Sequence, residues 1–430
     1  MQKSKSFEQI EKTSKFGIDL TLERISVLMN FLGNPQDKLK YVHVAGTNGK
    51  GSTCAVIQSI LTKAGYKTGK FISPHLEYFN ERISVNGLLI SDDEVERLSS
   101  IVLRKTEQMV KEGFEHPTQF EIICAMAFVY FYEQQCDIVV LEVGLGGRLD
   151  ATNVIENSLV SVITTIAFDH TDRLGNTLEQ IAVEKAGIIK KGSTVVSAPQ
   201  ETEVLKVIEN SCDKKHCKLI TVDAGAWKFK SLQEGFQVFD FERYSDLYLG
   251  LMGVHQLKNA VVAIKAIEEL REKGFVISNE SIYQGVENAQ NSGRFEILGQ
   301  SPEFVIDGAH NINGITALKD VLVSYYSGKR IILVMAVLSV KNYQEMVDIL
   351  APLADLCIVS EPVSENALSA YELAKCFKRN GKDCLIEKRI PEVLDLALEQ
   401  AGENDLVCFC GSLYFIGHVR TCYREKYWKR

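Results

Sequence analysis

Apolar runs of strand length, separated by longer segments of helical period, are the feature that most constrains the fold of this chain. The runs DIVVLEVG (137–144) and LVSVITTI (159–166) are almost continuously apolar, as is typical of strands buried on both faces of a parallel sheet. YVHVAG (41–46), KTGKFIS (67–73), TVVSA and KLITV (218–222) continue the pattern, with helices predicted between them. This alternation indicates an α/β protein with a mostly parallel sheet.

In the first part of the chain the sequence predicts helices and one stretch of a different kind. The helices are predicted over residues 52–64, 92–111, 118–134, 177–189, 256–273 and 279–289. Residues 225–253 differ, because WKFK alternates with period two and the stretch contains few helix formers. We expect a small antiparallel meander there, inserted after the main sheet.

The length of 430 residues favours two or three domains. Residues 291–303 (NSGRFEILGQSPE) are polar and marked by Gly and Pro, and they are the candidate boundary. Beyond them five further βα units follow, which suits a Rossmann-like second domain. The predicted division is 1–296, a mostly parallel sheet domain with the antiparallel insert, and 301–430, a Rossmann-like α/β domain.

Charge and composition exclude several classes of protein. With 48 Lys and Arg against 56 Asp and Glu, the net charge of −8 lacks the basic footprint of a nucleic-acid binder. The polar N-terminus has no apolar signal-peptide core, and no run suits a transmembrane helix. The eleven cysteines include no Cys-x-x-Cys pair and often stand in apolar runs, which indicates reduced thiols. We expect a cytoplasmic monomer that binds neither membranes nor nucleic acid.

The segment VAGTNGKGST (44–53) follows an apolar strand and precedes a helix, which is the context of a phosphate-binding loop. Its glycines let backbone N–H groups face a phosphate, and the helix dipole favours negative charge there. Lys50 can reach the β- and γ-phosphates. The strict Walker pattern is not met, because Val44 replaces the first glycine and Gly51 follows the lysine. A glycine turn without a ligand is therefore the alternative at this point.

Three other groups follow separate predicted strands. Ser73 ends the second strand, Glu142 lies near the end of VVLEVG, and Asp169-His170 follows SVITTI. The carboxyl ends of parallel strands form the edge where α/β proteins bind ligands. A hydroxyl, a carboxylate and an imidazole beside a triphosphate loop favour a magnesium site. Each group alone is more simply a turn or surface residue, so their shared position carries the interpretation.

Eight motifs in order resemble the folylpolyglutamate synthase/dihydrofolate synthase family, which belongs to the Mur-ligase-like, ATP-dependent amide ligases. They are GTNGKGS, SPHL, EVGLGGRLDATN, FDH, EKAGI, HQxxNA, GRFE and DGAHN. The match runs from about Phe16 to Asn311, with a compatible C-terminal domain after it. The loop form GKGS is similar to that of this family, which removes the difficulty with the strict Walker pattern.

The resemblance implies a role for particular residues of this chain. The implied ATP contacts are Thr47, Asn48, Gly49, Lys50, Gly51, Ser52, Asn259, Arg294 and Asp307. The implied magnesium ligands are Ser73 and Glu142 for one ion, with His170 and Lys185 for a second. The groups implied at the reacting atoms are Lys50, His170, Lys185, Arg294 and His310. Lys185 in EKAGI aligns with a lysine that is carbamylated in such ligases, and a monovalent cation is a further cofactor that the family admits.

Softer similarities concern the folate. Residues 16–20 (FGIDL) and the loop 77–87 resemble segments that surround the pterin in the family. The substrate contacts implied in this way are Ile18, Asp19, Leu20, Arg82, Phe120 and Asp150. An aromatic residue such as Phe120 serves equally well as part of the core.

The implied reaction is ATP-driven amide formation through an acyl phosphate that the amine of L-glutamate attacks. The substrates are folates, dihydropteroate or both, so a monofunctional folylpolyglutamate synthase remains an alternative. A Mur ligase that acts on a UDP-linked substrate is disfavoured, because only about 40 residues precede the loop. A nucleotide-binding switch module would not explain the second domain and its DGAHN motif.

Overall fold

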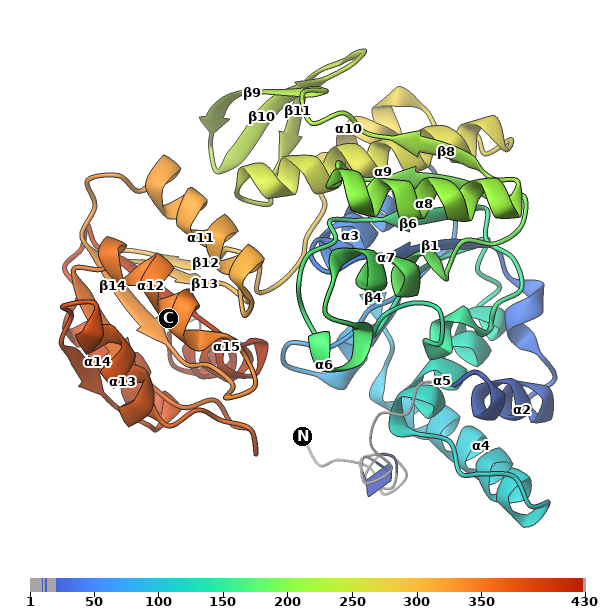
Figure 1. Cartoon of the computed structure of the whole chain (residues 1–430), viewed down its shortest axis with the longest axis horizontal. Coiled ribbons are helices and arrows are strands. Elements are labelled where there is room, and N and C mark those ends of the chain that lie inside the picture. The colour runs from blue at the N-terminus through green and yellow to red at the C-terminus, as the bar shows by residue number, and fades with distance from the viewer. Residues whose placement is uncertain (1–9, 11, 14–20, 428–430) are drawn as a thin grey trace. The chain divides into compact units, whose positions relative to one another are not determined.

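A computed structural model describes residues 10, 12, 13 and 21–427 of the chain. Two compact units are present (Figure 1). The first contains the described residues up to Ser231 together with Val238–Leu249 and Leu257–Ala289. The second contains Leu232–Gln237, Gly250–Gln256 and the described residues from Gln290 onward. Each unit is built around its own sheet.

An eight-stranded, mostly parallel sheet forms the first unit. In spatial order its strands are β4 (Leu88–Leu89), β3 (Ile83–Val85), β2 (Thr68–Phe71), β5 (Ile138–Glu142), β1 (Tyr41–Ala45), β6 (Val160–Ile163), β7 (Thr194–Ser197) and β8 (Lys218–Thr221). The strands from β2 to β8 in this order run parallel, whereas β3 and β4 form an antiparallel hairpin at one edge. The central position of β1 places the loop that follows it between the ends of β5 and β6.

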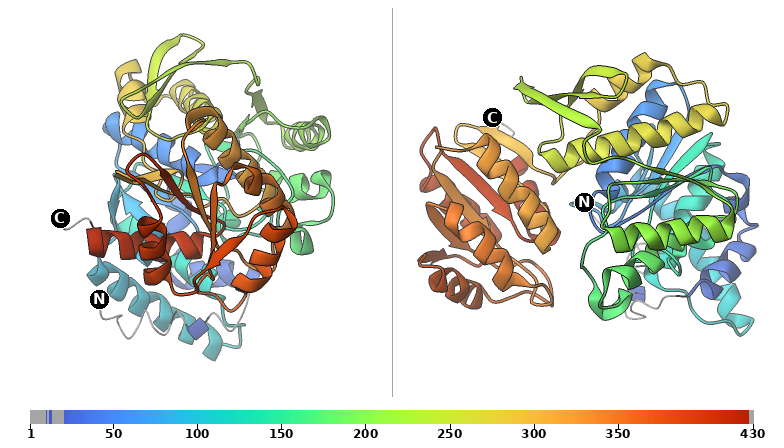
Figure 2. Two further views of the ribbon diagram at one scale, coloured as in Figure 1. Left: turned by 90° about the vertical axis from the view of Figure 1, so that its left-hand side faces the viewer. Right: turned by 45° about the horizontal axis from the view of Figure 1, so that its top comes forward.

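Helices cover both faces of this sheet (Figure 2). One face carries α3 (Lys50–Lys63), with α9 (Val254–Glu272) and α10 (Asn279–Glu287) beside it. The other face is covered by α2 (Glu23–Phe31), α4 (Asp92–Lys111), α5 (Gln119–Glu133), α7 (Leu178–Ala186) and α8 (Thr202–Lys215). Short helical turns complete the unit: η2 (Pro35–Lys38), η3 (Phe79–Arg82), η4 (Ala151–Val154) and α6 (Thr171–Leu174).

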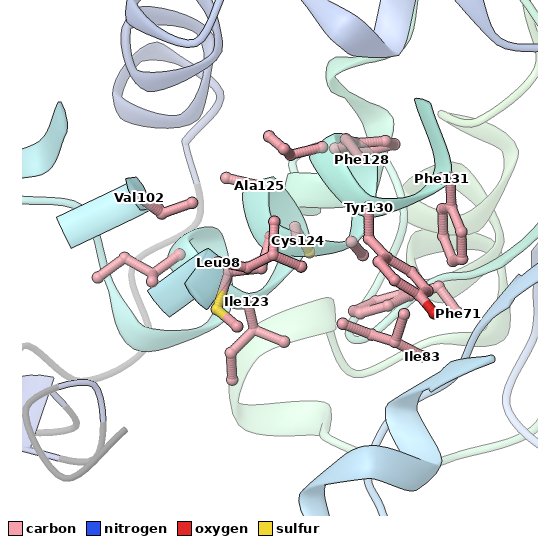
Figure 3. Packing of buried hydrophobic residues seen from close by; sticks show 14 of the residues in the cluster. Phe71, Ile83, Leu98, Val102, Ile123, Cys124, Ala125, Phe128, Tyr130 and Phe131 are labelled. Carbon is pink, nitrogen blue, oxygen red and sulfur yellow. The ribbon is translucent and has the colours of Figure 1, made fainter. Parts of the chain in front are cut away.

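One apolar cluster of the first unit lies around α5 (Figure 3). This helix is apolar on nearly all sides, as expected for a helix buried between a sheet and other helices. Phe128 packs edge-on against Tyr41 of β1. Thr118 and Glu121 form a capping box at the first turn, which fixes where the helix begins.

A three-stranded antiparallel sheet follows β8, as the sequence predicted. Its strands are β9 (Trp227–Gln233), β10 (Phe236–Phe241) and β11 (Tyr244–Leu249), with β10 in the centre. Phe239, Phe241 and Tyr244 are buried, whereas β9 is largely exposed. The alternating segment WKFK lies on the exposed strand β9, and the buried residues of this sheet come from β10 and β11.

The second unit is a Rossmann-like α/β domain. Its sheet has the order β12 (Glu296–Gln300), β13 (Glu303–Ile306), β17 (Leu406–Cys410), β14 (Ile331–Met335), β15 (Leu356–Val359) and β16 (Cys384–Ile386). The helices are α11 (Ile312–Tyr325), α12 (Tyr343–Leu350), α13 (Ala370–Arg379), α14 (Ile390–Glu399) and α15 (Leu413–Tyr427), with the turn η5 (Ala351–Leu353). All strand pairs are parallel except β12–β13. The mixed α/β class predicted from the sequence is confirmed.

Two short antiparallel elements were not expected. The hairpin β3–β4 lies in a stretch without a long apolar run. Strand β12 lies within residues 291–303, which the sequence indicated as a linker, and it pairs with β13. An edge strand needs only one buried face, so its sequence can be polar and short. The eleven cysteines are all free thiols, as expected.

Gly285 of α10 provides a test of the packing between α10 and α3. A Cβ atom at this position would lie 2.4 Å from the Cα of Ile60, a backbone atom that cannot move alone. Gly→Ala inside a helix usually stabilises by about 1 kcal/mol. We expect the opposite sign for Gly285→Ala, a net loss of about 1–3 kcal/mol, because overpacking outweighs propensity.

Urea unfolding of the purified variant measures this loss. Gly225→Ala is the control, because a Cβ atom there meets nothing within 4 Å. A Gly285→Ala variant as stable as the wild type would contradict the close packing of α10 on α3.

Candidate active site

The loop between β1 and α3 lies at the carboxyl edge of the first sheet. Its backbone N–H groups of Thr47 and Asn48 donate to the carbonyl oxygen of Thr165 at 2.9 and 3.3 Å. The Thr47 side chain donates to the Ala167 carbonyl (2.9 Å) and accepts from the Ala167 N–H (3.1 Å). The loop is thus bonded along one side to the segment after β6, and α3 begins at Lys50 with its N-terminus at the same edge.

Two glycines of this loop are required by close contacts. A Cβ atom at Gly46 would lie 1.8 Å from Oγ1 of Thr164. At Gly49, where φ is +91°, a Cβ atom would lie 2.3 Å from Oδ1 of Asn259. The second contact brings Asn259 of α9 against the loop, so the HQxxNA and GTNGKGS motifs meet in the first unit. A larger side chain at Gly49 would need both a strained backbone and a displaced Asn259.

Two lysine ammonium groups bind one carbonyl oxygen of the loop. Nζ of Lys50 donates to Gly46 O (3.1 Å) and Thr47 O (3.2 Å), and Nζ of Lys185 donates to Gly46 O (2.9 Å). Lys185 lies on α7 and is only 4% exposed. Burial, with the positive charge of Lys50, lowers the pKa of Lys185 to about 7, against the opposing charges of Asp169 and Asp150. With this pKa the Lys185 amine is present in both its protonated and its neutral form at neutral pH, and the neutral form is nucleophilic.

The groups predicted to bind magnesium follow three strands of the same sheet. Ser73 follows β2, Glu142 is the last residue of β5, and His170 follows β6. Glu142 is buried and pairs in register with Val44 of β1. His170 has a left-handed backbone, is half exposed, and its N–H donates to the Asp169 carboxylate at 2.9 Å. Over the described residues no group of three or more His, Cys, Asp or Glu side chains gathers as a metal cluster.

The EVGLGGRLDATN and EKAGI motifs form one structural unit. The N–H of Arg148 donates to Glu184 O at 2.7 Å, and the Arg148 guanidinium pairs with the Glu184 carboxylate at 2.9 Å. The Asn153 amide donates to Arg148 O and Gly187 O at 3.0 and 3.3 Å. These bonds fix the end of α7, and with it Lys185, relative to the loop after β5.

Buried side chains linked by hydrogen bonds support the loop after β5, and we call this set (Asp150, Thr152 and His43) the relay. Asp150 accepts from the N–H groups of Leu145 (2.8 Å) and Thr152 (3.0 Å) and from the Thr152 hydroxyl. The same hydroxyl contacts Nε2 of His43 at 3.0 Å. Because the Thr152 proton goes to Asp150, His43 must be the donor in this pair. Burial raises the pKa of Asp150 although these hydrogen bonds oppose it. The Asp150 carboxylate is therefore already bonded within the chain.

The other residues predicted to contact folate lie in the first unit. The ring of Phe120, in the first turn of α5, lies against Gly144, where a Cβ atom would lie 2.4 Å from its Cζ. Nε of Arg82 donates to Nδ1 of His75 at 2.8 Å, which joins two loops after β2. The predicted contacts Ile18, Asp19 and Leu20 fall outside the described residues.

Three further predicted residues meet in the second unit, at the carboxyl end of β13. The Asp307 carboxylate accepts from the N–H groups of Phe295 and Ala309, both at 2.8 Å. A Cβ atom at Gly308 would lie 2.9 Å from Nη1 of Arg294, and Nδ1 of His310 lies 2.8 Å from Gly308 O. Burial raises the pKa of Asp307, while the positive charge of Arg294 opposes the shift. Arg294, placed beside the linker from the sequence, thus lies with the DGAHN motif.

The turn that carries Arg294 is attached to the last helix. Glu296 accepts from the Gly293 N–H at 2.7 Å and pairs with Arg420 of α15, also at 2.7 Å. Arg420 and Glu296 are both largely buried. Nothing in the local sequence around GRFE indicated this partner, which lies 124 residues away.

Comparison with known proteins assigns the chain to a family. The Mur ligase middle domain matches residues 44–267, and the Mur ligase glutamate ligase domain matches residues 293–413. A Bacillus subtilis protein named dihydrofolate synthase/folylpolyglutamate synthase is 38% identical over 414 residues, which are 94% of this chain and 95% of that protein. The folylpolyglutamate synthase of Lacticaseibacillus casei is 33% identical, with 96% of each chain covered.

Solved structures agree. The crystal structure of folylpolyglutamate synthase from Thermotoga maritima has a TM-score of 0.86 at 35% identity and covers 98% of this chain and 97% of that one. The Mycobacterium tuberculosis folylpolyglutamate synthase, solved with ADP and AMPPCP, has a TM-score of 0.88 at 30% identity, covering 97% and 98%. The fold and the matched domains define an ATP-dependent, amide-forming ligase. The chain belongs to the folylpolyglutamate synthase/dihydrofolate synthase family of Mur ligases.

The relay below the loop gives a pH-dependent prediction. Burial, together with the positive charge of Lys190, lowers the pKa of His43 to about 3, so His43 stays neutral in the folded chain. The unfolded chain takes up this proton near pH 6.5, so stability falls as the pH drops below that value. Between pH 7 and pH 5 the free energy of unfolding of the wild type should fall by about 2 kcal/mol because of His43, and this part of the fall should be absent from a His43→Gln variant.

Urea unfolding at the two pH values measures the difference. His418→Gln, on an exposed position of α15, is the control and should retain the pH dependence of the wild type. Equal pH dependence in the wild type and His43→Gln would contradict a neutral, buried His43.

Proposed function

We propose that this chain adds L-glutamate to a folate and to dihydropteroate, using ATP. Its membership of the family and the names of its relatives support this substrate class. The observation that carries the proposal is the phosphate loop, where Lys50 and Lys185 both bind Gly46 O beside the N-terminus of α3. Positive charge beside the N-terminus of a helix suits a triphosphate.

The chemistry begins with transfer of the γ-phosphate to the substrate carboxylate. The amine of glutamate attacks the acyl carbon and forms the C–N bond. The C–O bond to the phosphate breaks, and inorganic phosphate and a proton are released. Both steps place negative charge on phosphoryl or carbonyl oxygens, so positioned cations lower the barrier. From the resemblance we assign this role to Lys50 and to Arg294, and we assign Asn259, Asp307 and His310 to the nucleotide.

Magnesium fits the side chains at the sheet edge. Glu142 offers a buried carboxylate and Ser73 a hydroxyl, both hard oxygen donors of the kind that Mg²⁺ prefers. These two residues would hold one ion, and His170 with a modified Lys185 would hold a second. Bound magnesium would neutralise charge on the phosphate oxygens.

For the folate we propose Arg82, Phe120 and the loop that Asp150 holds, with Ile18, Asp19 and Leu20 assigned by resemblance alone. The relay of His43, Thr152 and Asp150 gives that loop a fixed backbone. Eleven free thiols and membership of a family of folate enzymes support a cytoplasmic location. We also expect the protein to be a monomer. No helix within the described residues has the length and apolar character needed to cross a membrane.

ADP release in the presence of glutamate tests the proposed function. Dihydropteroate and tetrahydrofolate are supplied separately, and we expect turnover with each and none without a pterin substrate. Lys50→Ala should reduce turnover by at least a hundredfold while the fold is retained, because the variant lacks the cation that stabilises negative charge on the transferred phosphoryl group. Turnover with tetrahydrofolate alone would indicate a monofunctional enzyme, and pterin-independent ATP hydrolysis would favour a switch module.

We further propose that Lys185 is carbamylated. Its neutral amine attacks the carbon of CO₂ and releases one proton, which gives a carbamate anion. Burial and, after it, the positive charge of Lys50 lower the pKa of Lys185. An anion at this position would replace the repulsion between the two lysines by attraction. It would also supply a second carboxylate-like group to a metal ion.

Lys185→Ala should lose most activity and regain part of it with millimolar formate or acetate, which can occupy the vacated space. Lys190→Ala is the matched control, since Lys190 also has a pKa lowered by burial, to about 8, but bonds to Asn153 O instead. It should show no such rescue. A ¹³C carbamate signal after ¹³CO₂ labelling of the wild type checks the modification directly. Absent rescue and an absent signal would refute it.

A further inference from the structure

The segment after β6, residues 164–167, holds the phosphate loop on one side. Thr165 O accepts the N–H groups of Thr47 and Asn48, and Ala167 exchanges two hydrogen bonds with the Thr47 side chain. The segment therefore acts as a short strand paired with the loop. In such a segment the polar groups of alternate residues point to opposite sides. The Thr164 N–H donates to Ala45 O of β1 at 2.8 Å, whereas the Thr164 carbonyl and the Ile166 N–H bond to neither β1 nor the loop and need partners of their own.

Within the described residues no backbone group bonds to these two atoms. Beside β6, strand β7 continues its ladder as far as Ala198, whose N–H donates to Ile163 O at 2.8 Å. This is the last backbone hydrogen bond between the two strands, one residue before the segment that supports the phosphate loop.

The side chain of Gln200 takes the place of the missing strand. Its Nε2 donates to Thr164 O at 2.9 Å, and its Oε1 accepts from the Ile166 N–H at 3.1 Å. One planar amide thus satisfies a carbonyl and an N–H that are two residues apart, as a neighbouring strand would. Nε2 also lies 3.4 Å from Oγ of Ser197, which restrains the amide from the β7 side.

We propose that Gln200 is a positioning residue for nucleotide binding. It fixes residues 164–166, whose Thr165 carbonyl orients the N–H groups of Thr47 and Asn48. Gln200 itself touches neither the loop nor, by this proposal, the nucleotide. Its effect passes through a rigid, hydrogen-bonded segment, so losing the amide should loosen the loop without unfolding the sheet. The inference rests on the proposed role of the phosphate loop.

Three substitutions separate hydrogen bonding from shape. Gln200→Ala removes the amide, Gln200→Met keeps the length without polar atoms, and Gln200→Glu keeps the acceptor for Ile166 but places a carboxylate opposite Thr164 O. Two hydrogen bonds of ordinary strength correspond to about a tenfold change in affinity. We expect the Kd for ADP, measured by calorimetry, and the KM for ATP to rise about tenfold in all three variants. The KM values for glutamate and the pterin substrate should stay within twofold of the wild type.

The control is Glu201→Gln, at the next residue, whose exposed side chain forms no hydrogen bond at the start of α8. It should bind ADP as the wild type does. Normal ADP binding by Gln200→Met would overturn the proposal, because shape alone would then suffice. Equal rises in all KM values together with a lowered Tm would also overturn it, because the role would be one of general stability.

Lys50→Ala distinguishes this inference from the function on which it rests. If Lys50→Ala weakens ADP binding and the Gln200 variants do not, only the inference fails. If Lys50→Ala binds ADP normally, the assignment of the phosphate loop itself is wrong, and Gln200 loses its proposed role with it.

Discussion

The carbonyl oxygen of Gly46 joins the phosphate loop, α3 and α7 through hydrogen bonds, and the other contacts of the site are arranged around it. This oxygen accepts hydrogen bonds from Nζ of Lys50 in α3 and from Nζ of Lys185 in α7. Burial and, after it, the positive charge of Lys50 lower the pKa of Lys185. One carbonyl oxygen of the loop therefore binds two basic side chains that come from different helices.

Keeping Lys185 in place requires most of the other motifs. The contacts of Arg148 and Asn153 fix the end of α7, and the Asp150–Thr152–His43 relay fixes the loop after β5. Most polar groups of this network are hydrogen-bonded, although Nδ1 of His43 and Oδ1 of Asn153 are buried without a hydrogen-bond partner. The network joins residues that are widely spaced along the chain.

The sequence predicted the parts of the structure that follow from local pattern. Apolar runs located the long parallel strands, and period two located the sheet of β9, β10 and β11. The glycine pattern indicated the loop that holds Lys50. Gln200 and His43 were not predicted, because a side-chain amide that replaces a strand and an imidazole in a buried relay leave no periodic signal. Strand β12 was missed for a related reason, since an edge strand carries little of the apolar pattern used to find strands.

The link between Glu296 and Arg420 has a consequence for synthesis of the chain. Strand β13 has as its parallel neighbour the last strand, β17, and the Asp307 N–H donates to Phe409 O. The turn at Arg294 therefore cannot form all its contacts until β17 and α15 have been synthesised and have left the ribosome. During translation the first sheet can form early, whereas the second must wait for the final helix. A nascent chain shortened by a premature stop near residue 400 would lack this turn's support and would expose the apolar edge of β13 to quality control.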